Sequence, residues 1–211
     1  MGFRSPSQKE TVVRVSVCIV TFNQAAFIEE CIRSVMMQET DHALQVVVSD
    51  DHSSDATPEI LAQLEAEYPE TLTVIYRSSN MGPGPNFEAT LAECTGEYVA
   101  FLEGDNFWTD PQKIARQVAL LEANPDMACC FHRARSLEDT TSEPEHLIPR
   151  EDFPAVSSLE ILFGESNPVA FGSMLVRRHL MSEIGPWTRG LKLGDWPICI
   201  LLARHGSIGY L

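Results

Sequence analysis

The chain has 211 residues, of which 30 are acidic and 15 are basic, and its formal net charge at pH 7 is −15. This length suits a single α/β domain over residues 1–211 and leaves little room for two full domains. The negative field disfavours nucleic acid and anionic lipid headgroups as partners, whereas an acidic cleft can hold a divalent metal ion that in turn binds a phosphate.

The cysteines and the apolar runs indicate the compartment. The six cysteines stand mostly in apolar stretches, without a CxxC pair or zinc-type spacing, and we interpret them as reduced core thiols. No run of 18 apolar residues occurs, and residues 1–14 lack the apolar region of a signal peptide. The sequence therefore predicts a cytoplasmic protein.

Strands and helices are predicted in alternation through the first 131 residues. Apolar runs rich in β-branched residues predict strands over residues 12–20, 44–48, 72–76, 98–102 and 127–131. Helical spacing of apolar residues predicts helices over 25–37, from an N-cap at Thr57, over 87–94 and from Asp110. This order implies a Rossmann-like, mostly parallel sheet with helices on both faces, in which ligands bind beyond the carboxyl ends of the strands.

The last third of the chain is less regular. Residues 137–154 are rich in acid, Ser, Thr and Pro and predict a mobile loop. Beyond them we expect a strand over 169–176, short helices over 178–184 and 196–203, and a strand over 207–211. Because the chain stops directly after this strand, we expect either a truncation or a lost C-terminal region.

Three polar clusters follow predicted strands and should meet at one edge of the sheet. They are Thr21-Phe22-Asn23, Asp50-Asp51 with Asp55, and Glu103-Gly104-Asp105. Turn and cap chemistry accounts for Asp55 as well as any ligand does. The adjacent pair Asp50 and Asp51 should repel unless a hydrogen-bond donor or a cation compensates, and a nucleobase imide or a metal ion could do so.

The pair Glu103 and Asp105 suits a hard cation. Side chains two apart on an extended segment point the same way, and Gly104 between them permits close approach. Mg²⁺ and Mn²⁺ are commonly held by one or two carboxylates together with the oxygens of a diphosphate. The alternative is an exposed turn, with Phe107 and Trp108 covering the core. A Walker loop and a GxGxxG motif are both absent, which disfavours a dinucleotide site.

Several stretches together resemble a known family. VSVCIVTFN, VVVSDDHSSDAT, NMGPGPN, GEYVAFLEGDNFWTDPQKIARQVALLE and GDWPICILLARHGSIGYL, in this order, are similar to glycosyltransferase family 2 of the GT-A type. The resemblance covers residues 15–211. It implies an inverting transfer from a nucleotide-diphosphate sugar, with a nucleotide-sugar-binding half over 12–131, a smaller acceptor-binding half over 155–211, and Mn²⁺ or Mg²⁺ at a DxD-type motif.

The resemblance also implies roles for single residues. Asp105 would contact the metal ion, and Asp51 would accept a hydrogen bond from the base. Asn106 departs from the family, because many members have a third acidic residue there. The remaining nucleotide-binding positions implied by the resemblance are Thr21, Phe22, Asn23, Asp50, Glu103 and Gly104.

Asp195 falls where the family places its catalytic base. An inverting transfer needs a carboxylate that takes the proton from the attacking hydroxyl. From local sequence an N-cap for the following helix, with Pro197 in its first turn, explains Asp195 equally well. Three histidines, His132, His179 and His205, have no acidic partner nearby in sequence, and we assign them surface or structural roles.

Trp187 and Trp196 flank the predicted acceptor cleft, where an aromatic ring can stack on a sugar, although core packing explains at least one of them.

The expected partners are a nucleotide-diphosphate sugar, UDP by default, and a glycan or lipid-linked acceptor. We also expect peripheral association with the cytoplasmic face of a membrane, through the acceptor or through a missing C-terminal region. Two other readings stay open. One is a truncated or degenerate nucleotide-sugar-binding module of a larger synthase, and the other is a nucleotidyltransferase, which would want an early basic, Gly-rich loop that TFNQAAF lacks.

Overall fold

The computed structural model describes residues 14–137, 146–149, 153–163, 168–183 and 195–211. The strands are β1 (Val15–Thr21), β2 (Leu44–Asp50), β3 (Leu72–Tyr76), β4 (Tyr98–Glu103), β5 (Met127–Phe131), β6 (Ala134–Ser136), β7 (His146–Ile148), β8 (Val156–Ser157), β9 (Leu175–Arg177) and β10 (Ser207–Tyr210). The α-helices are α1 (Ile28–Met36), α2 (Thr57–Glu67), α3 (Pro83–Leu91), α4 (Lys113–Ala123) and α5 (Asp195–Ala203). Short 3₁₀ helices are η1 (Leu159–Phe163), η2 (Phe171–Ser173) and η3 (Arg178–Glu183).

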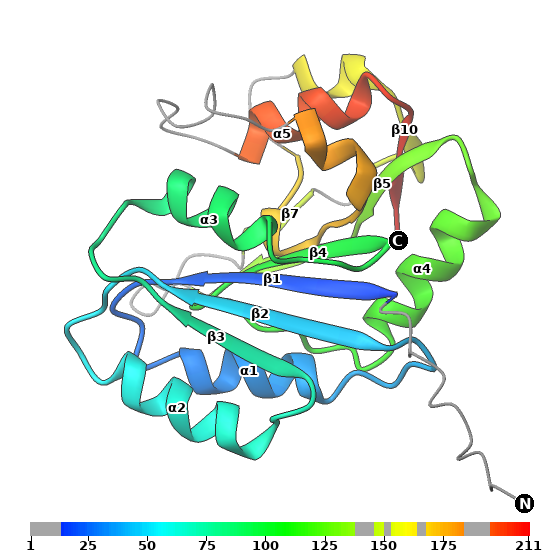
Figure 1. Cartoon of the computed structure of the whole chain (residues 1–211). Coiled ribbons are helices and arrows are strands. Elements are labelled where there is room, and N and C mark those ends of the chain that lie inside the picture. Colours follow the sequence, from blue (N-terminus) through cyan, green and yellow to red (C-terminus); the bar gives the residue numbers. More distant parts are fainter. Residues whose placement is uncertain (1–13, 138–145, 150–152, 164–167, 184–194) are drawn as a thin grey trace, which may run out of the picture.

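A mostly parallel, eight-stranded sheet in the order β3-β2-β1-β4-β9-β5-β10-β8 forms the centre of the protein (Figure 1). The neighbours β3, β2, β1 and β4 are all parallel, and so are β5 and β10. Strand β9 is antiparallel to both β4 and β5, so these two strands run in the same direction. The chain order reverses between β1 and β4, which is where α/β sheets of this kind bind their ligands.

The core lies on both faces of the sheet, as the continuous apolar runs predicted. Alternate residues of β1 face opposite sides: Val17 and Ile19 pack with α1, α2 and α4, and Cys18 packs with α3 and α5. Figure 1 shows α1 and α2 on one side of β1–β3 and α3 on the other. The expected helices on both faces are therefore confirmed.

Some predicted boundaries are wrong. Helix α3 begins at Pro83 and not at Phe87, because Gly82 adopts a positive φ of 85° and turns the chain into the helix, where proline is tolerated in the first turn. Thr57 is the first helical residue of α2 and not its N-cap. Helix α4 begins at Lys113 rather than at Asp110.

The predicted strand over 169–176 is wrong in its first half. Residues Phe171–Ser173 form η2, and only Leu175–Arg177 pair as β9. Gly172 packs against β4, where an added Cβ would lie 3.3 Å from Leu102 Cδ1, and its carbonyl accepts a hydrogen bond from Trp108 Nε1 at 2.9 Å. These contacts favour the tight turn over an extended strand.

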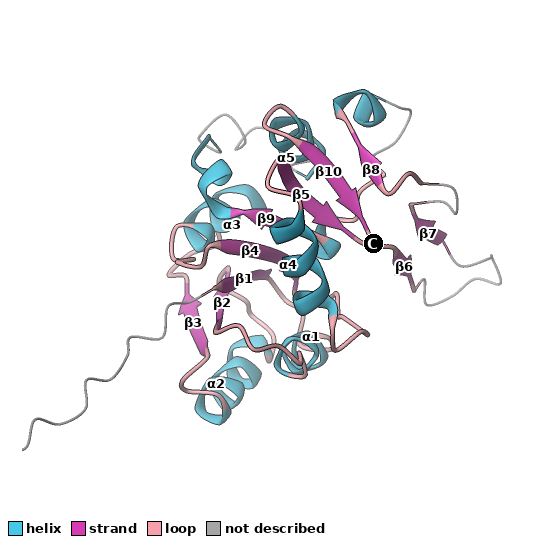
Figure 2. Cartoon of the chain, turned by 90° about the vertical axis from the view of Figure 1, so that its right-hand side faces the viewer, coloured by secondary structure: helices cyan, strands magenta, loops and turns pink. Residues whose placement is uncertain are grey.

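The predicted loop over 137–154 contains a strand, β7, that pairs with β6 in a small separate ribbon (Figure 2). Residues 138–145 and 150–152 of the predicted loop lie outside the described residues. Among the helices of the described segments, none has the length and apolar character needed to cross a membrane.

Candidate functional site

The three predicted polar clusters meet at the carboxyl edge of the sheet. Thr21 lies opposite Asp50 in the β1–β2 register, and Val20 lies opposite Glu103 in the β1–β4 register. The link continues beyond the strand ends, because Asp51 N–H donates to Thr21 O at 2.9 Å and Gly104 N–H donates to Val20 O at 3.0 Å. Parallel pairing thus brings the clusters together as the sequence predicted.

The loops that follow β1 and β2 are joined by side-chain hydrogen bonds. Asn23, whose φ is 54°, accepts a hydrogen bond from Ser54 N–H through its Oδ1 at 2.8 Å. Asp55 accepts from Ala25 N–H at 3.0 Å and from Thr57 N–H at 3.0 Å. Asp55 therefore has the turn role that its sequence allowed but does not cap α2, whose N-cap is Ala56. The Asn23 amide orders the loop beside Phe22, which is 45% exposed.

The adjacent carboxylates Asp50 and Asp51 are both buried, and protein donors compensate their charges. Asp50 accepts hydrogen bonds from the backbone N–H and from the hydroxyl of Ser53. Asp51 accepts from Met81 N–H through Oδ1 and from Gly82 N–H through Oδ2, each at 2.9 Å. The donors that the sequence argument required are thus backbone and hydroxyl groups, and the contact of Asp51 with a base stays a prediction.

The pair Glu103 and Asp105 is exposed at the same edge. Strand β4 ends at Glu103, so the two carboxylates do not lie on one extended segment as predicted, but Asn106 Nδ2 donates to both, at 3.0 Å to Glu103 and 3.3 Å to Asp105. Gly104 between them lies against the first strand end, where a Cβ would be 2.6 Å from Thr21 Oγ1. Only glycine fits this close approach.

These residues fit a divalent ion that is held largely by its substrate. The described residues contain no group of three or more His, Cys, Asp or Glu side chains that could hold a metal. Two carboxylates on an exposed edge match the protein share of an Mg²⁺ or Mn²⁺ site that a bound diphosphate completes. Asp105 and Glu103 would hold such an ion.

Arg77, which the sequence argument did not single out, lies at this edge directly after β3. Its Nε donates to Ser49 Oγ at 2.9 Å and to Asn86 Oδ1 at 3.2 Å, and its backbone N–H donates to Asp50 O at 3.0 Å. Its Nη2 atom is buried and has no hydrogen-bond partner among the described residues. The signal in the sequence was an arginine directly after the third predicted strand.

The family model described as "Glycosyl transferase family 2" matches residues 16–185. The chain belongs to this family. An uncharacterized protein of Mycobacterium tuberculosis (strain ATCC 25618 / H37Rv) is 33% identical over 200 residues, which cover 93% of this chain and 56% of the relative. The chain thus spans little more than half the length of this relative.

Solved structures share the family's GT-A fold. TarS 1–349 of S. aureus in complex with UDP matches with a TM-score of 0.71 and 19% identity, over 94% of this chain and 58% of the 1–349 chain. The mannosyltransferase PcManGT from Pyrobaculum calidifontis, in complex with GDP-Man and Mn²⁺, matches with a TM-score of 0.73 and 21% identity, over 96% and 55% of the two chains. At these identities the likeness establishes the fold.

The position expected for the family's catalytic base is the first residue of α5, Asp195. Its side chain lies outside the described part of the structure, as does Trp187. Trp196 donates its indole N–H to Leu162 O at 2.8 Å, which favours the packing role over stacking on a sugar.

Proposed function

We propose that this chain forms the donor site of a metal-dependent, inverting glycosyltransferase that moves a sugar from a nucleotide-diphosphate sugar, UDP by default, to a hydroxyl of a glycan or lipid-linked acceptor. The observation that carries the proposal is that Thr21, Asp51 and Asp105 lie at the carboxyl edge of the sheet, where the chain order reverses between β1 and β4. Residues 12–131 supply the donor half, and residues 155–211 supply the acceptor half.

The nucleotide side of the proposed site is built on β1–β3. Phe22 and Tyr76, each 45% exposed at this edge, offer apolar surface to a base or ribose, and Asp51 offers carboxylate lone pairs to a base N–H. We call this surface of Phe22, Tyr76 and Asp51 the nucleotide wall. Asp50 supports it from within the protein, and Asn23 fixes the loop that carries Phe22. Arg77, whose Nε donates to Ser49 and Asn86, supplies a cation near the nucleotide.

The diphosphate side is built on β4. The metal ion, when bound at Asp105 and Glu103, offsets the charge that develops on the departing diphosphate. Gly104 lets the donor approach the strand end because no side chain intervenes. Asp195, at the start of α5, takes the proton from the acceptor hydroxyl.

A donor assay tests the proposal. The protein is incubated with UDP-sugars and Mn²⁺ or Mg²⁺, and UDP release is measured with and without candidate acceptors. Asp195→Asn should lower release at least a hundredfold while its UDP affinity stays within about twofold, because loss of a general base removes about 10²–10⁴ in rate. Full activity of this variant would refute the assignment of the base.

A second candidate is a nucleotide-sugar-binding module without transfer activity. Asn106 in place of a third carboxylate favours it, since it leaves a pair of acidic ligands at this edge among the described residues. UDP binding without release of UDP from any tested donor would support this candidate over the enzyme.

Binding to vesicles that carry a lipid-linked acceptor, compared with bare vesicles, tests the proposed peripheral membrane contact.

A further inference from the structure

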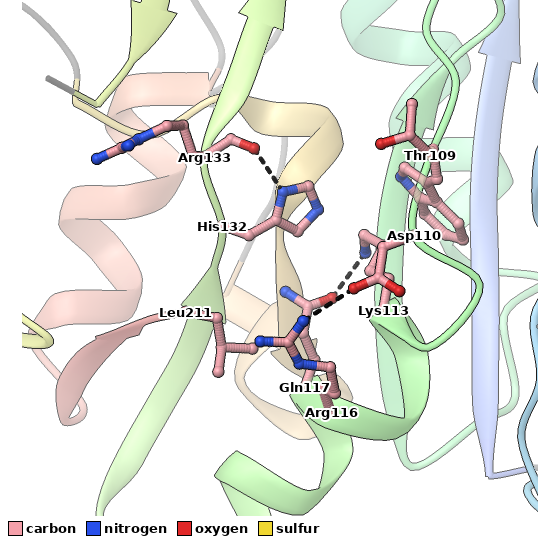
Figure 3. A pocket seen from close by; sticks show the side chains of 9 residues that line it. Thr109, Asp110, Lys113, Arg116, Gln117, His132, Arg133 and Leu211 are labelled. Atoms are coloured by element: carbon pink, nitrogen blue, oxygen red, sulfur yellow. Dashed lines mark hydrogen bonds and ion pairs between the residues drawn. The ribbon is translucent and has the colours of Figure 1, made fainter. Parts of the chain in front are cut away.

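A cavity of about 230 Å³ lies between α4 and the end of β5 (Figure 3). Its lining includes four basic residues, Lys113, Arg116, Arg133 and His132, and one acid, Asp110. Asp110 is already paired with Arg116 at 2.9 Å. In a chain with a net charge of −15, this local excess of basic groups stands out.

Lys113 is the least exposed of these groups, at 4%. Its Nζ donates to Gln117 Oε1 at 2.7 Å and lies 3.9 Å from the centre of the Trp108 ring. In the part of the chain that the structure describes, no carboxylate forms an ion pair with it. Burial lowers the pKa of Lys113 to about 7. A buried ammonium without a counter-ion is unfavourable, and an anion in the cavity would supply the missing charge.

His132 presents an unsatisfied atom in the same wall. Its Nδ1 lies 2.8 Å from Arg133 O, and since a carbonyl only accepts, Nδ1 carries the proton. Its Nε2 is buried and has no hydrogen-bond partner in the described segments. Burial, with the nearby charge of Lys113, lowers the pKa of His132 to about 4. A bound anion would raise the pKa of His132 again, so that Nε2 could take up a proton and donate a hydrogen bond to the anion.

The cavity lies next to the proposed transfer site but away from the nucleotide wall. Trp108, which lines it, follows Asp105 by three residues, so their Cα atoms lie at most about 11 Å apart. In the sheet order, β5 stands on the opposite side of β4 from β1–β3. Leu211, from the proposed acceptor half, also lines the cavity and donates its backbone N–H to Phe131 O at 3.1 Å.

We propose that this cavity is an oxyanion site that takes a carboxylate or phosphate group carried by the acceptor. The volume exceeds that of a single water, whose share of the liquid is about 30 Å³, and suits a small charged group. Lys113 supplies positive charge and His132 supplies a further polar contact, whereas the Arg133 guanidinium points away from the cavity (Figure 3). The assignment to the acceptor rests on the proposed glycosyl transfer, whereas the anion site itself rests on the cavity alone.

Titration calorimetry with inorganic phosphate, and separately with acetate, tests the site in the presence of saturating UDP. We expect the wild-type protein to bind at least one of the two anions, and the tighter one identifies the group. Lys113→Met, which keeps the size of the side chain, should weaken that binding at least tenfold. Arg204→Met, which removes an exposed charge at the end of α5 outside the cavity, should change it less than twofold.

Other outcomes are equally decisive. Absence of binding by either anion, unchanged binding in Lys113→Met, or equal weakening in Arg204→Met would overturn the site. If Lys113→Met does not fold, His132→Phe, which keeps a ring and removes the unpartnered Nε2, should weaken the binding as well. UDP affinity measured in the same samples separates the two proposals: anion binding without UDP binding refutes the donor function and leaves the cavity proposal standing, and the reverse result refutes the cavity.

Discussion

The carboxylate of Asp51 holds the backbone N–H of Gly82 at 2.9 Å, and its other oxygen holds Met81 N–H at the same distance. This contact fixes the loop before α3 against the end of β2. It also connects the residue expected to recognise the base with a loop that is distant in sequence. The end of β2 and the loop before α3 are thus joined by hydrogen bonds within the protein.

Asp51→Asn should destabilise the protein by about 1–3 kcal/mol. The amide oxygen can accept a hydrogen bond from only one of the two backbone N–H groups, and the amide NH₂ group would face the other. Urea unfolding measures the loss. Asp126→Asn, at an exposed position at the opposite end of the sheet, serves as the matched control and should change the free energy of unfolding by less than about 0.5 kcal/mol. Equal stability of the two variants would contradict a stabilising role for the hydrogen bonds that Asp51 accepts from Met81 and Gly82.

Gly104→Ala should both destabilise the fold and weaken UDP binding. The new Cβ would lie 2.5 Å from Gln24 Oε1 and 2.6 Å from Thr21 Oγ1, so the strand ends must separate, at a cost of about 1–3 kcal/mol. Adding Gln24→Ala relieves one of the two contacts and should recover part of the stability. Wild-type stability and UDP affinity in the single variant would show that the edge is not closely packed.

Lys113→Met should be more stable than the wild type, and the difference should depend on pH. Burial lowers the pKa of Lys113 from 10.5 to about 7. Between these pH values the unfolded chain binds a proton that the folded chain lacks, so the contribution of Lys113 to the free energy of unfolding rises with pH across this window. Below about pH 7 Lys113 is charged in both states, so the full cost of burying its ammonium group lowers the free energy of unfolding of the wild type.

Urea unfolding at pH 6, 8 and 10 checks this dependence. The stability gain of Lys113→Met should be on the order of 1–4 kcal/mol at pH 6 and should shrink towards zero by about pH 10. Arg204→Met should show no such trend, since its side chain is exposed. A stability gain of Lys113→Met that stays constant with pH would show that the pKa of Lys113 is not lowered by burial.

The sequence predicted the sheet well because its strands are continuous apolar runs. Strands over 72–76 and 127–131 have the predicted bounds, and parallel pairing then brings the polar clusters to one edge. The helix starts were less predictable, because they depend on the positive φ of Gly82 and on contacts of Asp55 with a distant loop.

The basic cavity was not predictable from local sequence. Lys113 looks like a surface lysine on a helix, and His132 was assigned a surface or structural role. Their burial arises only when α4, β5 and the segment around Trp108 pack together. The hydrogen bonds of Asp51 to the loop before α3 were not predictable for the same reason, since Met81 and Gly82 lie 30 and 31 residues from Asp51 in the sequence.

The most direct test of the donor site is the affinity for UDP, measured by titration calorimetry with and without Mn²⁺. Mn²⁺ should increase the affinity of the wild-type protein at least tenfold, and Asp105→Ala should abolish most of that gain while it keeps the metal-independent affinity. Asp126→Ala, an exposed control at the far end of the sheet, should behave as the wild type. An equal gain in Asp105→Ala, or no effect of Mn²⁺ on the wild-type protein, would contradict a metal-assisted diphosphate site at this edge.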